Sequence, residues 1–207
     1  MKDFKSDQEK FWAEEFGDAY INRNQKQRTI AANTNLFSKV FSRTRCIESI
    51  IEFGANIGLN QKAIKNLKPE ARRVAVEINK RASEILGQEI GAENVINESI
   101  LELNLKEQFD MSFIKGVLIH INPEDLQTVY EKLYNASKRY ILVTEYYNPS
   151  PVTIPYRGHS NRLFKRDFAG EIMDKYPDLE LIDYGFTYRR DPNFKLDDST
   201  WFLMERR

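Results

Sequence analysis

The spacing of apolar residues near the start of the chain predicts two helices. Residues 7–23 carry aromatic side chains at helical intervals, and Gln27 to Phe41 continue with apolar side chains that face inward. The aromatic residues of the first helix are Phe11, Trp12, Phe16 and Tyr20. We expect residues 1–45 to form a helical cap on the rest of the fold.

From residue 46 onward, short β-branched and aromatic runs alternate with helical segments. Helices are expected at Asn60–Leu67, Asn79–Glu89 and Pro123–Ala136, the last of which begins with a proline and two acids. The strand-like runs are 47–53, 73–77, 94–97, 109–114 and 139–145. This alternation predicts an α/β fold with a parallel sheet and right-handed crossovers.

The final third of the chain departs from this alternation. A proline-containing loop at 148–157 precedes one more helix, expected from Lys165 to Tyr176. Two strands follow at 179–188 and 200–206, and their short polar connection suits a hairpin. Residues 1–207 are therefore predicted to form one domain, whose core at 46–207 is a mixed seven-stranded sheet with an antiparallel end.

Composition narrows the classes of function. Charged residues make up 30% of the chain and balance to a net charge of zero, which disfavours binding to nucleic acid or to an anionic membrane. Cys46 is the single cysteine, so an internal disulfide and a cysteine-cluster metal site are excluded, and we expect its thiol to be buried. The sequence shows neither a signal-peptide core nor a membrane-spanning run, and we expect a cytoplasmic protein without a metal site.

A glycine turn between the first core strand and its helix is the main candidate for a cofactor site. The window Glu52–Asn60 reads EFGANIGLN, which matches neither the dinucleotide fingerprint nor the phosphate-loop motif. Glu52 would repel a pyrophosphate but suits an ammonium group, and Glu77 ends the next strand where an acid can bind ribose hydroxyls. These features favour S-adenosylmethionine, although a purely structural turn with two strand-end acids remains an alternative.

These motifs resemble those of the class I S-adenosylmethionine-dependent methyltransferases over nearly the whole chain. The E-x-G-x-x-x-G turn at Glu52–Gly58 resembles their first motif, and Glu77 resembles their ribose-binding acid. The run FDMSFIKGVLIHINP resembles their fourth strand and the turn after it. The resemblance implies a Rossmann-like fold with an N-terminal helical lid, S-adenosylmethionine as cofactor and S-adenosylhomocysteine as product.

The resemblance also implies a set of cofactor-binding positions. Besides Glu52, Gly54, Gly58 and Glu77, they are Tyr20, Arg28, Ala55, Asn56, Ile78, Ser99, Ile100, Lys115, Gly116 and Val117. Two of them depart from the family pattern. Asn56 replaces a glycine, and Ser99 replaces the aspartate that often contacts the adenine. Asparagine tolerates left-handed backbone, so the turn is expected to form.

Longer strings resemble a narrower group, the methylases associated with pseudaminic acid biosynthesis. They include EKFWAEEFGDAYINRN, KGVLIHINP and TEYYNPSPVTIPYRGHSNRLFKRDFAGE. This resemblance implies a context in bacterial surface glycans, such as capsule, flagellin glycan or lipopolysaccharide.

Candidate catalytic residues follow the fourth strand or lie in a basic loop. Lys115 and His120 lie where cofactor and acceptor are expected to meet, and His159 lies in the loop PYRGHSNRLFKRD. A histidine can act as a proton acceptor, but His120 can equally be structural or contact the cofactor. Aromatic and basic side chains suit a small anionic substrate, although a solvated basic loop is the alternative. The candidate substrate-binding residues are Tyr146, Tyr147, Tyr156, Arg157, His159, Lys165 and Arg166.

The sequence leaves several functions open. The favoured one is O-methylation of a small anionic precursor, such as a nonulosonic acid or a phosphoryl or phosphoramidate decoration. N-methylation of an amino sugar is its rival. An NAD-dependent oxidoreductase is disfavoured by the glycine spacing and by Glu52, and a binding protein without catalytic activity remains a third class. The oligomeric state is not predicted.

Overall fold

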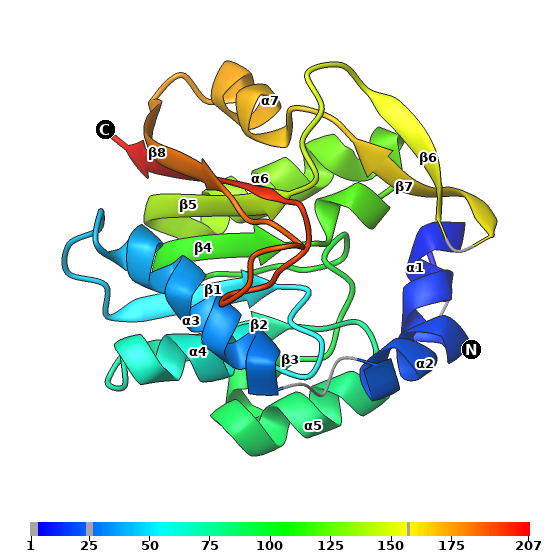
Figure 1. Cartoon of the computed structure of the whole chain (residues 1–207), viewed down its shortest axis with the longest axis horizontal. Helices are drawn as coiled ribbons and strands as arrows, with labels where there is room; N and C mark the ends of the chain where they lie inside the picture. Colours follow the sequence, from blue (N-terminus) through cyan, green and yellow to red (C-terminus); the bar gives the residue numbers. More distant parts are fainter. Residues whose placement is uncertain (1–3, 24–26, 157) are drawn as a thin grey trace.

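The structure is a computed structural model that describes residues 4–23, 27–156 and 158–207. Over these residues it contains a seven-stranded sheet in the order β3-β2-β1-β4-β5-β9-β8 (Figure 1). The strands are β1 (Ser49–Phe53), β2 (Arg72–Val76), β3 (Val95–Ile96), β4 (Phe109–Lys115), β5 (Ser137–Glu145), β8 (Leu179–Phe186) and β9 (Thr200–Arg206). The first five pair in parallel, and β9 runs antiparallel to both β5 and β8. The predicted mixed sheet with its antiparallel end is confirmed.

Helices cover both faces of this sheet (Figure 1). One face carries α3 (Gln27–Phe41), α4 (Leu59–Leu67) and α5 (Lys80–Ile90), and the other carries α6 (Leu126–Ala136) and α7 (Phe168–Lys175). Because successive strand residues face opposite sides, β1 sends Ile50 toward α3 and Ile51 toward α6. Both faces are therefore buried, as parallel sheets require.

The carboxyl ends of β1, β2, β4 and β5 meet at one edge, and two further units lie there (Figure 1). One is the pair of helices α1 (Asp7–Ala13) and α2 (Glu15–Arg23), and the other is the two-stranded sheet of β6 (Val152–Tyr156) and β7 (His159–Lys165). Gln8 of α1 donates a hydrogen bond to the Asn161 carbonyl of β7 at 3.2 Å. β7 also packs against η2, the short 3₁₀ turn Leu118–His120 that follows β4.

Several sequence-based boundaries were wrong, each for a local reason. Residues 7–23 form two helices because Glu14 leaves the helical region, and Gly17 then approaches the end of α1 so closely that a Cβ would lie 2.0 Å from the Trp12 carbonyl oxygen. The segment expected to be a loop contains β6, and the helix expected from Lys165 starts only at Phe168, where Asp167 accepts a hydrogen bond from the Gly170 amide at 2.9 Å.

Two other expectations change in detail. The helix expected from Pro123 begins with η3, a 3₁₀ turn at Pro123–Asp125, before α6. Ala92–Asn94 forms the remaining short turn, η1. Cys46 is exposed, with a φ of 52°, so the expectation of a buried thiol was wrong. No helix in the described part of the chain is both long and apolar enough to span a bilayer.

Replacing Phe37 by Ala tests how strongly α3 is held on the sheet. Phe37 is fully buried, and its ring meets Phe113 of β4 edge-to-face at 5.4 Å between centroids. We expect the free energy of unfolding to fall by about 3–5 kcal/mol, because the truncation leaves a cavity between helix and sheet. Urea denaturation measures this change. The control Phe194→Ala removes an exposed ring and should change stability by less than about 0.5 kcal/mol; equal effects would contradict the packing.

Candidate active site

The turn between β1 and α4 runs through three residues with left-handed backbone. Their φ angles are 76° at Gly54, 47° at Asn56 and 81° at Gly58. A Cβ on Gly54 would lie 2.6 Å from Cγ2 of Val117, so this glycine also permits close contact between the ends of β1 and β4. At Asn56 the side-chain Oδ1 accepts a hydrogen bond from the Ile57 amide at 2.8 Å. The expected turn has formed with asparagine in the middle.

Glu52 lies directly beneath this turn and is completely buried. Its two oxygens accept hydrogen bonds from Asn60 Nδ2 at 2.6 Å and Gln61 Nε2 at 2.7 Å. Burial raises the pKa of Glu52 to about 7, and these two hydrogen bonds oppose the rise. Asn60 Oδ1 and Gln61 Oε1 are buried and have no hydrogen-bond partner among the described residues. A buried carboxyl group beside two such acceptors fits a ligand that carries an ammonium group.

Glu77 lies at the end of β2, next to the same turn. Its Oε2 accepts a hydrogen bond from the Asn56 amide at 2.6 Å, and its Oε1 accepts one from the Asn79 amide at 2.8 Å. Burial raises the pKa of Glu77, and these backbone hydrogen bonds oppose the rise. Each carboxylate oxygen keeps further lone-pair capacity, so the fixed carboxylate can also accept hydrogen bonds from a pair of ligand hydroxyl groups.

Lys115 ends β4 and is half-buried among acids. Burial lowers the pKa of its ammonium group, while the carboxylates of Glu52, Asp197 and Glu145 act in the opposite direction. Glu145 ends the neighbouring β5, and its Oε1 accepts hydrogen bonds from the Val117 and Leu118 amides, both at 2.9 Å. Burial raises the pKa of Glu145 to about 7. The ends of β4 and β5 are therefore joined by one anchored carboxyl group.

Three tyrosines converge in front of this edge. They are Tyr20, Tyr146 and Tyr156. The pKa of Tyr146 is raised by burial, then by the Asp197 carboxylate, and further by the nearby Tyr20 and Tyr156. Lys165 places its Nζ 5.3 Å from the centre of the Tyr146 ring. The sequence predicted the three tyrosines and Lys165 as site residues, and the structure brings them together. Asp197 and Glu145 were missed.

His120 lies in η2 and is largely buried. Its Nδ1 is 2.6 Å from the Arg162 carbonyl oxygen; because a carbonyl only accepts, Nδ1 carries the hydrogen. Burial lowers the pKa of His120 to about 4, and its ring lies 4.6 Å from that of Trp12 and 4.9 Å from that of Tyr156. The neutral ring ties β7 and α1 to η2, which supports a structural role, and a cofactor contact stays a prediction. A role as proton acceptor stays a prediction.

The remaining predicted substrate-binding residues do not join this cluster in the described structure. The Arg166 guanidinium forms an ion pair with Glu171 at 2.5 Å, so its charge is already matched. Tyr147 is 41% exposed, and its ring lies beside Phe202 rather than with the other tyrosines. Arg157 lies outside the described residues. His159 belongs to β7, but its side chain is not described.

The other cofactor candidates line the edge in different ways. Ala55 is buried in the turn, and Ile78 and Ile100 are half-buried after β2 and β3. Gly116 donates its amide to the Thr144 carbonyl at 3.0 Å. Ser99 forms a hydrogen bond with Glu9 of α1, which the sequence did not predict. Arg28 is exposed in the first turn of α3.

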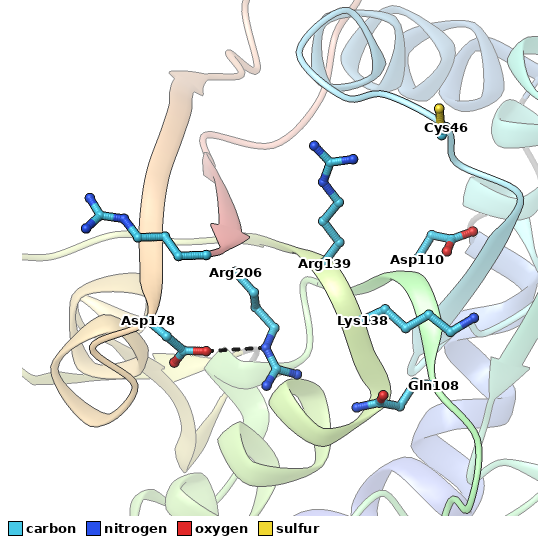
Figure 2. Close-up of a pocket in the computed structure, with 8 residues that line it drawn as sticks. Cys46, Gln108, Asp110, Lys138, Arg139, Asp178 and Arg206 are labelled. Carbon is cyan, nitrogen blue, oxygen red and sulfur yellow. Dashed lines mark ion pairs between the residues drawn. The ribbon is translucent and has the colours of Figure 1, made fainter.

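A separate hollow of about 680 Å³ lies at the opposite edge of the sheet, where β4 and β5 begin (Figure 2). Within it Arg206 is paired with Asp178 at 3.4 Å, and Asp110 accepts hydrogen bonds from the Glu48 and Ser49 amides. Its lining residues are Cys46, Gln108, Asp110, Lys138, Arg139, Asp178, Arg206 and Arg207. The hollow contains none of the predicted site residues.

Comparison with solved structures identifies the fold. A magnesium protoporphyrin IX methyltransferase of Synechocystis with bound S-adenosylhomocysteine matches with a TM-score of 0.68 at 13% identity, over 97% of this chain and 100% of that one. The chain has the class I methyltransferase fold. An S-adenosylmethionine-dependent methyltransferase of Clostridium acetobutylicum matches with a TM-score of 0.65 at 11% identity, over 92% of this chain and 97% of that one.

A third matching structure is of a methyltransferase named for a different substrate from the first. It is the 1,6-didemethyltoxoflavin-N1-methyltransferase of Burkholderia thailandensis, with a TM-score of 0.67 at 15% identity over 92% of this chain and 83% of that one. Neither a protein-family model nor a curated protein sequence matches the chain. The fold is therefore established, while the narrower resemblance to the pseudaminic acid-associated methylases is not confirmed.

Replacing Glu52 by Gln tests the buried carboxyl group through the pH dependence of stability. The folded-state pKa of about 7 exceeds the ordinary 4.5, so between these values the unfolded chain releases a proton that the folded protein retains. Stability should therefore fall as pH rises through this window and stay lower above it, and Glu145 contributes with the same sign. We expect Glu52→Gln to reduce the slope and to be more stable than the parent protein above pH 7, as measured by urea unfolding from pH 4 to 8.

The matched control for this experiment is Glu107→Gln. Glu107 is paired with Arg72 at the surface, which lowers its pKa, so above about pH 5.5 it is ionised in both the folded and the unfolded state. Its replacement should leave the slope between about pH 5.5 and pH 7 unchanged. If Glu52→Gln kept the full slope of the parent protein, Glu52 would ionise as an ordinary exposed carboxyl group.

Proposed function

We propose that the protein is an S-adenosylmethionine-dependent methyltransferase. The observation that carries this proposal is the buried carboxyl group of Glu52, with the unpartnered oxygens of Asn60 and Gln61 beside it and a left-handed glycine turn above it. In this proposal these acceptors bind the ammonium group of the cofactor, and Glu77 binds the ribose hydroxyls. Structures of the same fold that were determined with the cofactor or its product support the assignment.

When bound, the cofactor supplies a methyl group on a positively charged sulfur. The acceptor atom must then lie in line with the methyl carbon and the sulfur, so the main task of the chain is alignment. In this proposal Lys115, Tyr146 and Tyr156 form the mouth in which the acceptor is held. The half-buried Lys115 ammonium group and Lys165 beside Tyr146 supply positive charge for an anionic group of the acceptor.

The proposed substrate is a small anionic precursor of a bacterial surface glycan, methylated on oxygen. The resemblance of the long strings to the pseudaminic acid-associated methylases supports this context, and the two lysines at the mouth support an acidic acceptor. The net charge of zero supports a small molecule over a nucleic acid. A nonulosonic acid or a phosphoryl or phosphoramidate decoration has the required chemistry.

One observation favours N-methylation as a second candidate. The Asp197 carboxylate lies beside the Tyr146 hydroxyl and favours the charged form of Lys115. The mouth therefore also contains negative charge and aromatic faces. A carboxylate and aromatic rings suit a protonated amino group. An amino sugar that also carries an anionic group would use both the acid and the lysines.

The cofactor assignment is tested by calorimetric titration with S-adenosylhomocysteine and with NAD. We expect S-adenosylhomocysteine to bind and NAD not to bind. Gly54→Ala should weaken binding at least about tenfold, because a Cβ there would lie 2.6 Å from Val117 and the residue has a φ of 76°. The control Gly91→Ala has a similar left-handed φ of 88° but lies at the end of α5 and should bind like the parent protein. Binding of NAD alone would overturn the proposal.

The acceptor site is tested by a methylation screen over nucleotide sugars, nonulosonic acids and phosphoryl or phosphoramidate metabolites. With any substrate found, Lys115→Met should lower kcat/KM at least about tenfold, because it removes the charge at the mouth. The matched control is Lys138→Met, an exposed lysine at the opposite edge of the sheet, which should leave turnover unchanged. Equal activity of both variants would contradict the role of Lys115.

A further inference from the structure

The inner face of α1 carries a buried carboxylate that the sequence did not assign to the site. Glu9 is only 8% exposed although α1 is a short helix at the surface. One of its oxygens bonds to the Ser99 hydroxyl, and the other accepts the Lys5 amide at 2.8 Å. Because Ser99 Oγ also accepts the Leu101 amide at 3.0 Å, the serine hydroxyl hydrogen is the one that points to Glu9. The segment before α1, through Lys5, and the segment after β3, through Ser99, therefore both bind this buried carboxylate.

A second polar group on the same face of α1 lacks a partner. Trp12 follows Glu9 by three residues, so the two side chains are neighbours on the helix. The Trp12 Nε1 atom is buried and has no hydrogen-bond partner among the described residues. Its ring lies against His120 of η2. A buried N–H group without an acceptor is costly, which indicates that a ligand atom completes it.

The position of α1 places both groups beside the proposed ribose site. Asn79 Nδ2 donates to the Ala13 carbonyl at 3.2 Å and to Asp18 Oδ1 at 3.0 Å, which holds the junction of α1 and α2 against the start of α5. Asn79 also donates its amide to Glu77, the proposed ribose-binding acid. Glu9 in turn touches Ser99, which follows β3. The inner face of α1 thus borders the carboxyl ends of β2 and β3.

We propose that Glu9 and Trp12 bind the adenine ring of the cofactor. Glu9 accepts a hydrogen bond from the exocyclic amino group, and Trp12 Nε1 donates one to a neighbouring ring nitrogen. Adenine suits this arrangement because it presents a donor and an acceptor side by side on one edge. Glu9 thereby supplies, from a different segment, a carboxylate that is absent at Ser99. The inference rests on the proposed function.

Hypoxanthine provides the sharpest comparison, because it replaces the amino group of adenine by an oxygen that only accepts hydrogen bonds. A carboxylate at Glu9 would face this oxygen with no hydrogen between them. The site should therefore prefer S-adenosylhomocysteine to S-inosylhomocysteine, whose base has an oxygen in place of the amino group and a hydrogen on the adjacent ring nitrogen N1. The preference, rather than the affinity alone, reports the role of Glu9.

The test measures the dissociation constants of both compounds by calorimetry for the parent protein and for Glu9→Ala, Glu9→Gln and Trp12→Phe. The parent should prefer S-adenosylhomocysteine by about tenfold or more. Glu9→Ala should lose most of this preference, and Glu9→Gln should reduce it while keeping the size of the side chain. Trp12→Phe should weaken binding of S-adenosylhomocysteine several-fold. The control Glu14→Ala, an exposed acid at the end of α1, should match the parent.

Each of the other possible results would contradict the role of Glu9, the role of Trp12 or the proposed function. If the parent protein shows no preference, or if the Glu9 variants keep it, Glu9 does not bind the base, while the proposed function stands. If Glu9→Ala weakens both compounds equally, Glu9 serves only to hold α1 in place and the inference is wrong. Unchanged binding by Trp12→Phe would remove Trp12 from the inference. If the parent protein binds neither compound, the proposed function fails first.

Discussion

The arrangement of the site depends on the burial of one carboxyl group, that of Glu52 at the end of β1. Removing this group from water is costly, and the side-chain amides of Asn60 and Gln61 offset part of the cost. Both amides come from the first turn of α4, so they fix the start of that helix against the end of β1. The intervening chain must then reverse within a few residues, which requires left-handed backbone. Asn56 sits in this reversal and gives its amide to Glu77, so the same constraint extends to β2.

The core of the fold was predictable because its signals are local. Buried parallel strands produce continuous apolar runs, and α3 has the bounds that its apolar spacing indicates. The pair β6 and β7 was missed because Pro151 and Pro155 indicate a loop, while contacts with η2 and α1 stabilise it as a sheet. The break in the N-terminal helix depends on Gly17 approaching Trp12, which helical periodicity does not reveal.

Part of the candidate site was predictable because its residues follow strands directly. Glu52, Glu77 and Lys115 could be placed because a strand end fixes their position at the carboxyl edge. Asp197 and Glu9 could not, because the β8–β9 connection and α1 reach this edge only after the chain has folded. The sequence left the basic cluster open between an anion site and a solvated loop paired with nearby acids, and for Arg166 the pairing with Glu171 is the one that has formed.

The contacts of α1 have a kinetic meaning as well as a structural one. α1 touches β7 through Gln8 and η2 through Trp12, and neither contact belongs to the main sheet. For a ligand held beneath this helix, entry and exit require these contacts to break while the sheet remains intact. The rate of exchange would then be set by the detachment of a single short helix.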